Sequence, residues 1–169
     1  MYKVSEVVAE LRISYATEIE IIENYLANAA NLEGGARAEA IKNLFDEEVS
    51  TALGHARRLA KRINALEGRV PGPLELPRAD KGLRPPDVAD VDIAVHDAIE
   101  SEDAAIAQYE QIIRFCDGHD FVTLDLAIEL LVDERERRQR LVALLPGSNV
   151  NSDDMSRQLA APAAKLSTL

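Results

Sequence analysis

Four long segments in which apolar residues recur every three or four positions dominate this sequence. They cover about residues 4–32, 36–66, 88–116 and 120–145. That spacing places the apolar side chains on one face of an α-helix, and such a face is stable only when another element buries it. At 169 residues the chain has the size of a single domain. The sequence therefore predicts an all-α protein with four helices packed around one core.

The connections between these segments predict how the helices are arranged. Gly34 and Gly35 interrupt the pattern between the first and second segments. Gly118, a helix stop, and Asp120, a candidate N-cap, lie between the third and fourth. Connections this short place consecutive helices side by side and antiparallel. We therefore expect two helical hairpins.

A proline-rich stretch separates the two hairpins. Residues 68–88 contain five prolines, which prevent either neighbouring helix from continuing. The stretch is long enough to run back along a helix of about 45 Å. This organisation is typical of an antiparallel four-helix bundle with one long crossover between its second and third helices. We assign residues 1–146 to the bundle and residues 147–169 to a C-terminal tail, which we expect to pack on the bundle or on a neighbouring subunit.

Composition and charge narrow the classes of function. The net charge of −11 argues against nucleic acid as a partner, because such binding rests on lysine and arginine neutralising phosphates. No apolar run reaches membrane-spanning length, and the N-terminus lacks the pattern of a signal peptide. The single cysteine, Cys116, excludes a disulfide within the chain and is expected to be a buried core thiol. We expect a soluble cytoplasmic protein that binds neither nucleic acid nor membranes.

Carboxylates interrupt the apolar faces of the first and third segments. Steps of three and four residues place Glu18 and Tyr25 on the face of the first segment. The same steps place Glu102 and Tyr109 on the face of the third. Each tyrosine follows its glutamate by seven residues, and the two pairs lie 84 residues apart. The second and fourth segments repeat each other with an offset of 82 residues, so the sequence looks like a duplicated helical hairpin.

Buried carboxylates need a positive charge nearby. An isolated ionised carboxylate in a protein interior is too costly to persist, so it is neutralised, paired with a cation or bound to a metal. Helical bundles can build a dinuclear metal site from one Glu on each of two helices and a Glu-x-x-His pair on each of the other two. Oxygen-rich sites with imidazole suit iron or manganese. The glutamates on the apolar faces therefore point to a metal centre in the core.

Three stretches of the chain resemble the ferritin-like superfamily, and bacterioferritin most closely. They are the run from Glu18 to Tyr25, HARRLAKRINALEG at 55–68 and HDFVTLDLAIELLVDE at 119–134. The resemblance extends over residues 4–145. It implies a four-helix bundle with a crossover, a homo-oligomer such as a cage, and oxidation and storage of ferrous iron. Carried over by position, it implies four metal ligands: Glu18, His55, Glu102 and Glu134.

The sequence departs from the family pattern at the metal ligands. Position 52, where the pattern has Glu, is Ala52, and position 137, where it has His, is Arg137. Leu53 stands where the family's haem-binding methionine would be, so no haem is expected. Iron is the expected metal, ahead of manganese. Glu48, one helical turn before Ala52, is a candidate replacement for the missing carboxylate.

Arg137 leaves two arrangements of the core open. A guanidinium keeps its proton and cannot bind a metal, but facing inward it can pair with Glu134 or Glu102. If it turns to the surface instead, the remaining ligands can hold one metal ion. Tyr25 and Tyr109 are expected to pack in the core or to hydrogen-bond a site carboxylate.

Two functions follow from these arrangements. The first is a ferroxidase-like, iron-binding protein with an incomplete dinuclear site. The alternative is a non-catalytic structural or interaction protein of the same fold, in which an Arg–Glu network replaces the metals. A DNA-protecting mini-ferritin is disfavoured by the acidic charge of the chain.

Overall fold

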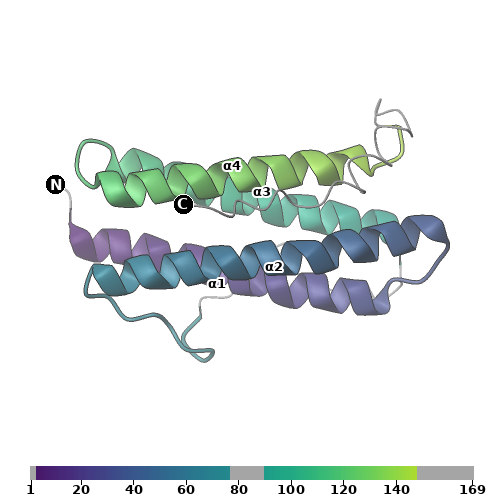
Figure 1. Ribbon diagram of the computed structural model, residues 1–169, viewed down its shortest axis with the longest axis horizontal. Helices are drawn as coiled ribbons and strands as arrows, with labels where there is room; N and C mark the ends of the chain where they lie inside the picture. The colour runs from purple at the N-terminus through teal and green to yellow at the C-terminus, as the bar shows by residue number, and fades with distance from the viewer. Residues whose placement is uncertain (1–2, 77–89, 148–169) are drawn as a thin grey trace, which may run out of the picture.

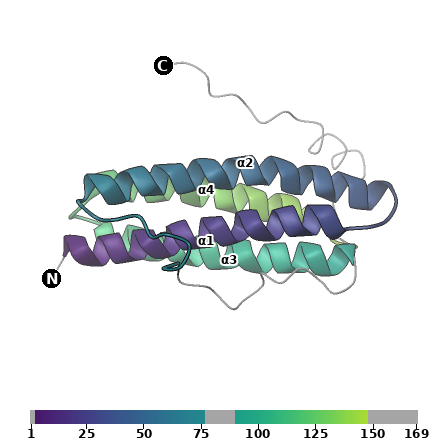
Figure 2. The ribbon, with the colours of Figure 1, turned by 90° about the horizontal axis from the view of Figure 1, so that it is seen from below.

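The computed structural model describes residues 3–76 and 90–147 of the chain. Within these ranges the helices are α1 (Val4–Asn31), α2 (Ala36–Ala65), α3 (Val91–Cys116) and α4 (Phe121–Ala143). α1 and α2 form one antiparallel hairpin, α3 and α4 form the other, and the two hairpins pack face to face (Figure 1, Figure 2). α2 ends and α3 begins at opposite ends of the bundle, as a crossover requires (Figure 1). The predicted all-α bundle is confirmed, whereas the predicted packing of the tail concerns residues outside the described ranges.

Local capping decides where two of the helices begin. α3 begins three residues later than predicted, because the Asp90 side chain accepts hydrogen bonds from the backbone N–H groups of Asp92 and Ile93. α4 begins directly after Asp120, whose carboxylate accepts a hydrogen bond from the backbone N–H of Thr123, as predicted for an N-cap. The other helix ends lie within two residues of their predicted positions.

Two glycines are needed where the chain leaves a helix. Gly118, directly after the C-cap of α3, has a φ of 71°, a left-handed conformation that favours glycine. Gly68, after α2, lies against α1, and a Cβ atom built on it would come within 2.6 Å of Val8 Cγ1. The absence of a side chain at Gly68 therefore lets the chain leaving α2 pack directly on α1.

The core draws buried apolar side chains from all four helices, such as Leu11, Ile63, Ile112 and Leu130. Tyr25 and Phe45 stack within it, with ring centroids 4.7 Å apart and planes inclined by 14°. Cys116 is fully buried, as predicted, and burial together with the charge of Asp120 raises the pKa of its thiol to about 11. None of the described helices is long and apolar enough to cross a membrane.

An ion pair ties the end of α2 to the start of α4. Arg62 donates to both carboxylate oxygens of Asp120, at 2.8 and 2.9 Å, and its Nε donates to Thr123 Oγ1 at 2.8 Å. Burial raises the pKa of Asp120, but the hydrogen bonds from Thr123 and the charge of Arg62 outweigh it and bring the pKa down to about 2. The Asp120 carboxylate therefore stabilises the folded state while it is ionised.

We expect Asp120→Asn to lower the free energy of unfolding by about 2 kcal/mol near neutral pH, because asparagine keeps the cap but loses the ion pair. The folded-state pKa lies below that of an unfolded aspartate. The contribution is therefore complete above about pH 5 and is lost as the pH falls towards about 2. Urea denaturation followed by circular dichroism across this pH range measures the difference.

The control for this prediction is Asp125→Asn, which changes an exposed carboxylate on the same helix. Its effect should stay within about 0.5 kcal/mol at every pH. If Asp120→Asn lowers the free energy of unfolding as much near pH 2 as at neutral pH, the role assigned to the Asp120 charge is contradicted.

Candidate metal centre

Eight polar and charged side chains from the four described helices meet in the interior of the bundle, and each of the eight is at most 3% exposed. They are Glu18 and Tyr25 of α1, Glu48 and His55 of α2, Glu102 and Tyr109 of α3, and Glu134 and Arg137 of α4. The members of each pair lie three or seven residues apart, so both project from the same face of their helix. The structure thus brings together the residues that the sequence predicts for the site.

One half of the centre combines a histidine with two carboxylates. His55 Nδ1 lies 2.8 Å from Glu134 Oε1 and 3.3 Å from Glu18 Oε1. One ligand atom from each of these three residues lies within 4.8 Å of the others. Tyr109 donates its hydroxyl to Glu18 Oε1 at 2.6 Å, but the described part of the chain supplies neither a hydrogen bond nor an ion pair to Glu18 Oε2. A buried carboxylate oxygen without a partner is costly, so this half can accept a cation.

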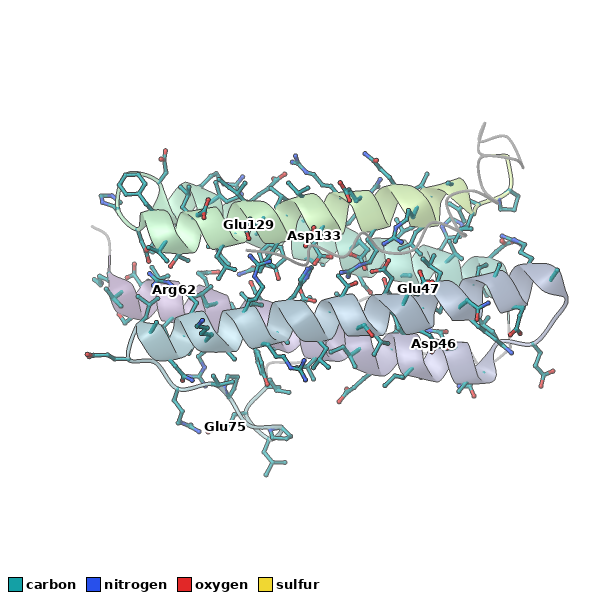
Figure 3. The ribbon with its side chains drawn as sticks, in the orientation of Figure 1. Asp46, Glu47, Arg62, Glu75, Glu129 and Asp133 are labelled. Carbon is teal, nitrogen blue, oxygen red and sulfur yellow. The ribbon has the colours of Figure 1, made fainter. Side chains whose placement is uncertain are left out.

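The His55 ring is held from both sides. Its outer nitrogen, Nε2, lies 3.1 Å from Asp133 Oδ2 of α4, a side chain that is 45% exposed (Figure 3). Burial alone lowers the pKa of His55, but the hydrogen bonds and charges of Glu134 and Glu18 outweigh it and raise the pKa to about 10. In the metal-free protein, His55 is therefore an imidazolium ion surrounded by carboxylates.

The other half of the centre is built around Arg137, which is 1% exposed and faces inward. Its Nε lies 2.8 Å from Glu48 Oε2, and its Nη1 lies 3.0 Å from Glu134 Oε2. Nη1 also donates to both oxygens of Glu102, at 3.2 and 3.3 Å. Tyr25 donates its hydroxyl to Glu102 Oε1 at 2.5 Å. Of the two arrangements left open by the sequence, the structure adopts the inward one.

The carboxylates of the centre are paired with cationic side chains in the metal-free structure. Burial raises the pKa of Glu102 well above its usual range, and the neighbouring Glu134 adds to this while Arg137 opposes it. Each buried carboxylate of the centre has a cationic neighbour: His55 for Glu18, Arg137 for Glu102, His55 and Arg137 for Glu134, and Arg137 and Arg140 for Glu48. These ion pairs offset part of the cost of burying the charges.

Sequence reasoning missed two residues that complete these contacts. Asp133 lies off the apolar face of α4, so the periodicity excludes it. A signal was available, because a metal-binding histidine usually hydrogen-bonds a carboxylate through its other nitrogen. Arg140, 39% exposed, pairs with Glu48 Oε1 from the edge of the core. Both oxygens of Glu48, the candidate replacement ligand, are therefore engaged by arginines.

The two halves of the centre differ in whether they can hold a metal ion. The Arg137 guanidinium lies among the carboxylates that would bind a second metal ion, and the buried Ala52 supplies no ligand. A dinuclear centre does not fit these residues. A single metal ion fits the other half, where Glu18, His55 and Glu134 converge and one carboxylate oxygen lacks a partner.

Comparison with known proteins places this geometry in a family. The family model described as "Ferritin-like domain" matches residues 8–146. A dodecameric thioferritin of Bacteroides fragilis, described as bacterioferritin-related, has 28% sequence identity and a TM-score of 0.78, over 93% of this chain and 90% of that one. A ferritin-like, diiron-carboxylate protein of Bacillus anthracis has 26% identity and a TM-score of 0.72, over 86% of this chain and 99% of that one.

A third structure, a Dps1 mutant of Mycobacterium smegmatis, is 18% identical with a TM-score of 0.73, over 83% of this chain and 95% of that one, and supports the fold alone. No curated protein sequence matches the chain. The family match covers both hairpins and all the residues of the centre. The chain therefore belongs to the ferritin-like family.

Proposed function

We propose that this protein is a ferritin-like iron-handling protein that binds one divalent metal ion per chain, at Glu18, His55 and Glu134. Arg137 permanently supplies the positive charge of the second metal position. The observation that carries the proposal is Glu18 Oε2, a buried oxygen that has no partner among the described residues and belongs to one of the three residues that converge as possible ligands. A metal ion is the simplest partner for such an oxygen.

The surrounding residues support this assignment. Tyr109 holds the Glu18 carboxylate, Asp133 holds the His55 ring, and Arg137 holds the second oxygen of Glu134. Outer contacts of this kind orient ligands and raise metal affinity. Two carboxylates with one imidazole suit ferrous iron, with manganese second, and iron bound there would supply one-electron redox chemistry. Because Nδ1 of His55 must lose its proton to bind a metal, affinity should fall as the pH is lowered.

Anaerobic titration of metal-free protein with ferrous iron tests the proposal. We expect one ferrous ion to bind per chain, and Glu18→Gln or His55→Gln to abolish that binding. Asp133→Asn should weaken it by about 10–100-fold, because it removes the hydrogen bond that orients the histidine. Glu23→Gln, which changes an exposed carboxylate on the same helix as Glu18, is the matched control and should bind iron like the parent.

The same protein should then be exposed to air, because oxidation of ferrous iron above the buffer rate tests the ferroxidase activity. Two irons per chain in the parent would contradict the single site. No bound iron and no oxidation above the buffer rate would overturn the proposal.

A second candidate function is a non-catalytic structural or interaction protein of the same fold. The observation that favours it is that, without a metal, Arg137 and His55 already form ion pairs with their carboxylate neighbours. The iron titration separates the two candidates, since this one expects no metal. Both include assembly into a homo-oligomer, which the dodecameric relative supports.

A further inference from the structure

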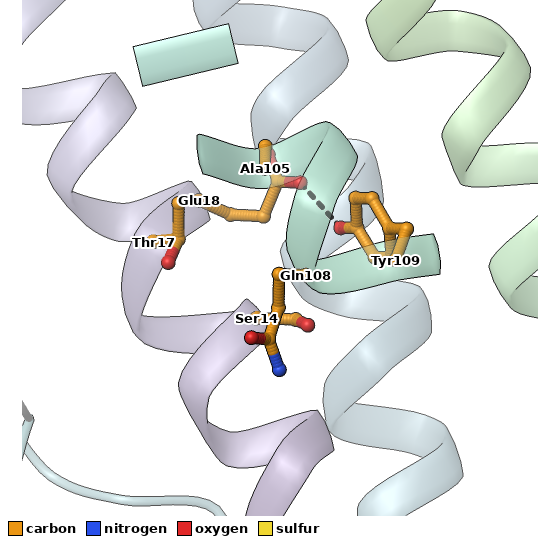
Figure 4. Close-up of a pocket in the computed structure, with 6 residues that line it drawn as sticks. All are labelled: Ser14, Thr17, Glu18, Ala105, Gln108 and Tyr109. Atoms are coloured by element: carbon orange, nitrogen blue, oxygen red, sulfur yellow. Dashed lines mark hydrogen bonds between the residues drawn. The ribbon is translucent and has the colours of Figure 1, made fainter. Parts of the chain in front are cut away.

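A small pocket lies between α1 and α3 beside the metal centre. It is lined by Ser14, Thr17, Glu18, Ala105, Gln108 and Tyr109 (Figure 4). Ser14 and Glu18 are buried, whereas Thr17 and Gln108 are half-buried and form its rim. Glu18 therefore belongs both to this pocket and to the proposed metal site.

Two oxygen atoms of the residues lining this pocket lack a partner. Ser14 Oγ and Glu18 Oε2 are both buried and make no hydrogen bond within the described part of the chain. Glu10, Ser14 and Glu18 are spaced four residues apart, so they follow one face of α1 in steps of about 6 Å. Exposure falls along this series, from half-buried Glu10 to fully buried Glu18. A carboxylate, a hydroxyl and a second carboxylate are ligands that a hard divalent cation accepts.

Gln108 crosses from α3 to α1 at the rim of the pocket. Its amide donates to Glu10 Oε2 at 2.8 Å and to the Glu10 carbonyl oxygen at 3.3 Å. The pocket is too narrow to hold a water molecule in this arrangement. An ion can therefore pass through the pocket only if Gln108 moves. A cation bound at the Glu10 carboxylate would compete with the hydrogen bond that holds Gln108 in place.

We infer that a divalent cation reaches the metal site along Glu10, Ser14 and Glu18, and that Gln108 gates this route. The inference rests on the proposed one-metal function. The opposite face of the bundle, between α2 and α4, is less suited to entry. There the His55 ring stands between Asp133 and the other ligands, so an entering ion would have to displace a ligand.

Stopped-flow binding of Co²⁺, followed by its visible absorption, tests the route. Gln108→Ala should raise the association and dissociation rates together by about tenfold, the factor expected for losing a hydrogen bond to a carboxylate. Ser14→Ala should slow association, because it removes the intermediate ligand. Gln111→Ala, which removes an exposed glutamine from the same helix, is the matched control and should bind at the parental rate.

A second measurement needs no metal. In Ser14→Cys, the introduced thiol should react slowly with methyl methanethiosulfonate. Adding Gln108→Ala to this variant should accelerate the reaction by a factor similar to that for Co²⁺ binding. Cys116 gives only a slow background reaction, because it is buried and its pKa is raised. Unchanged labelling and Co²⁺ rates in the Gln108→Ala variants would overturn the gate. A parent that binds no Co²⁺ overturns the one-metal function and the cation route with it, while accelerated labelling still supports control of the pocket by Gln108.

Discussion

Arg137→Met is expected to lower the free energy of unfolding by about 3–5 kcal/mol, because three buried glutamates lose the cation that they share. Methionine preserves much of the side-chain length, so the loss reports charge and hydrogen bonding more than volume. Urea denaturation of metal-free protein, followed by circular dichroism, measures the change. Ferrous iron or Co²⁺ should restore part of the lost stability, since a cation can then enter among the carboxylates.

Arg138→Met provides the matched control. Arg138 is the next residue along α4 and pairs with Asp103, but its side chain is 39% exposed and that of its partner 52%. Exposed pairs of this kind contribute at most about 1 kcal/mol. If Arg137→Met proves as stable as Arg138→Met, the buried carboxylates hold protons of their own and Arg137 is not their counter-charge.

The double variant Ala52→Glu with Arg137→His should convert the centre to one that binds two ferrous ions per chain. It supplies a carboxylate and an imidazole at the two positions where the family pattern has them, and it removes the guanidinium that excludes the second metal. Iron oxidation in air should rise well above that of the parent. Anaerobic titration and oxidation kinetics measure both changes.

The single variants show whether the two positions act together. Ala52→Glu alone adds another carboxylate to a fully buried position, and Arg137→His alone removes the shared cation, so each should be less stable than the double variant with metal bound. Ala52→Gln with Arg137→His keeps the shape but lacks the charge, and should not bind two ions. A folded double variant that still binds one ion would show that the second metal position lies elsewhere.

Periodicity was sufficient to predict the four helices, but not every residue that faces the core: Val4 is exposed, and the buried Asn24 and Asn28 were not predicted. Glu18 and Glu102 were found because they interrupt apolar faces, and burial of both agrees with that reasoning. The start of α3 was less predictable, because the Asp90 cap decides it and several nearby residues are equally capable of capping. Periodicity is a signal spread over a whole helix, whereas the exact first residue of a helix depends on one capping side chain.

The direction of the Arg137 side chain could not be deduced from its own helix. Its partners include Glu48 on α2 and Glu102 on α3, which lie far away in the sequence and become neighbours only in the folded bundle. The role of Asp133 was hidden for a related reason, because its partner His55 belongs to a different hairpin. The chemistry of the site depends on contacts between the two hairpins. The spacing of residues within one helix does not predict such contacts.

Each tyrosine of the centre donates a hydrogen bond to a glutamate of the other hairpin. Tyr25 of the first hairpin holds Glu102 of the second, and Tyr109 of the second holds Glu18 of the first. Of these four side chains, Glu18 alone belongs to the proposed metal site. Because the chain itself supplies these hydrogen bonds and the positive charges of Arg137 and His55, the two hairpins are joined through the centre without a metal ion.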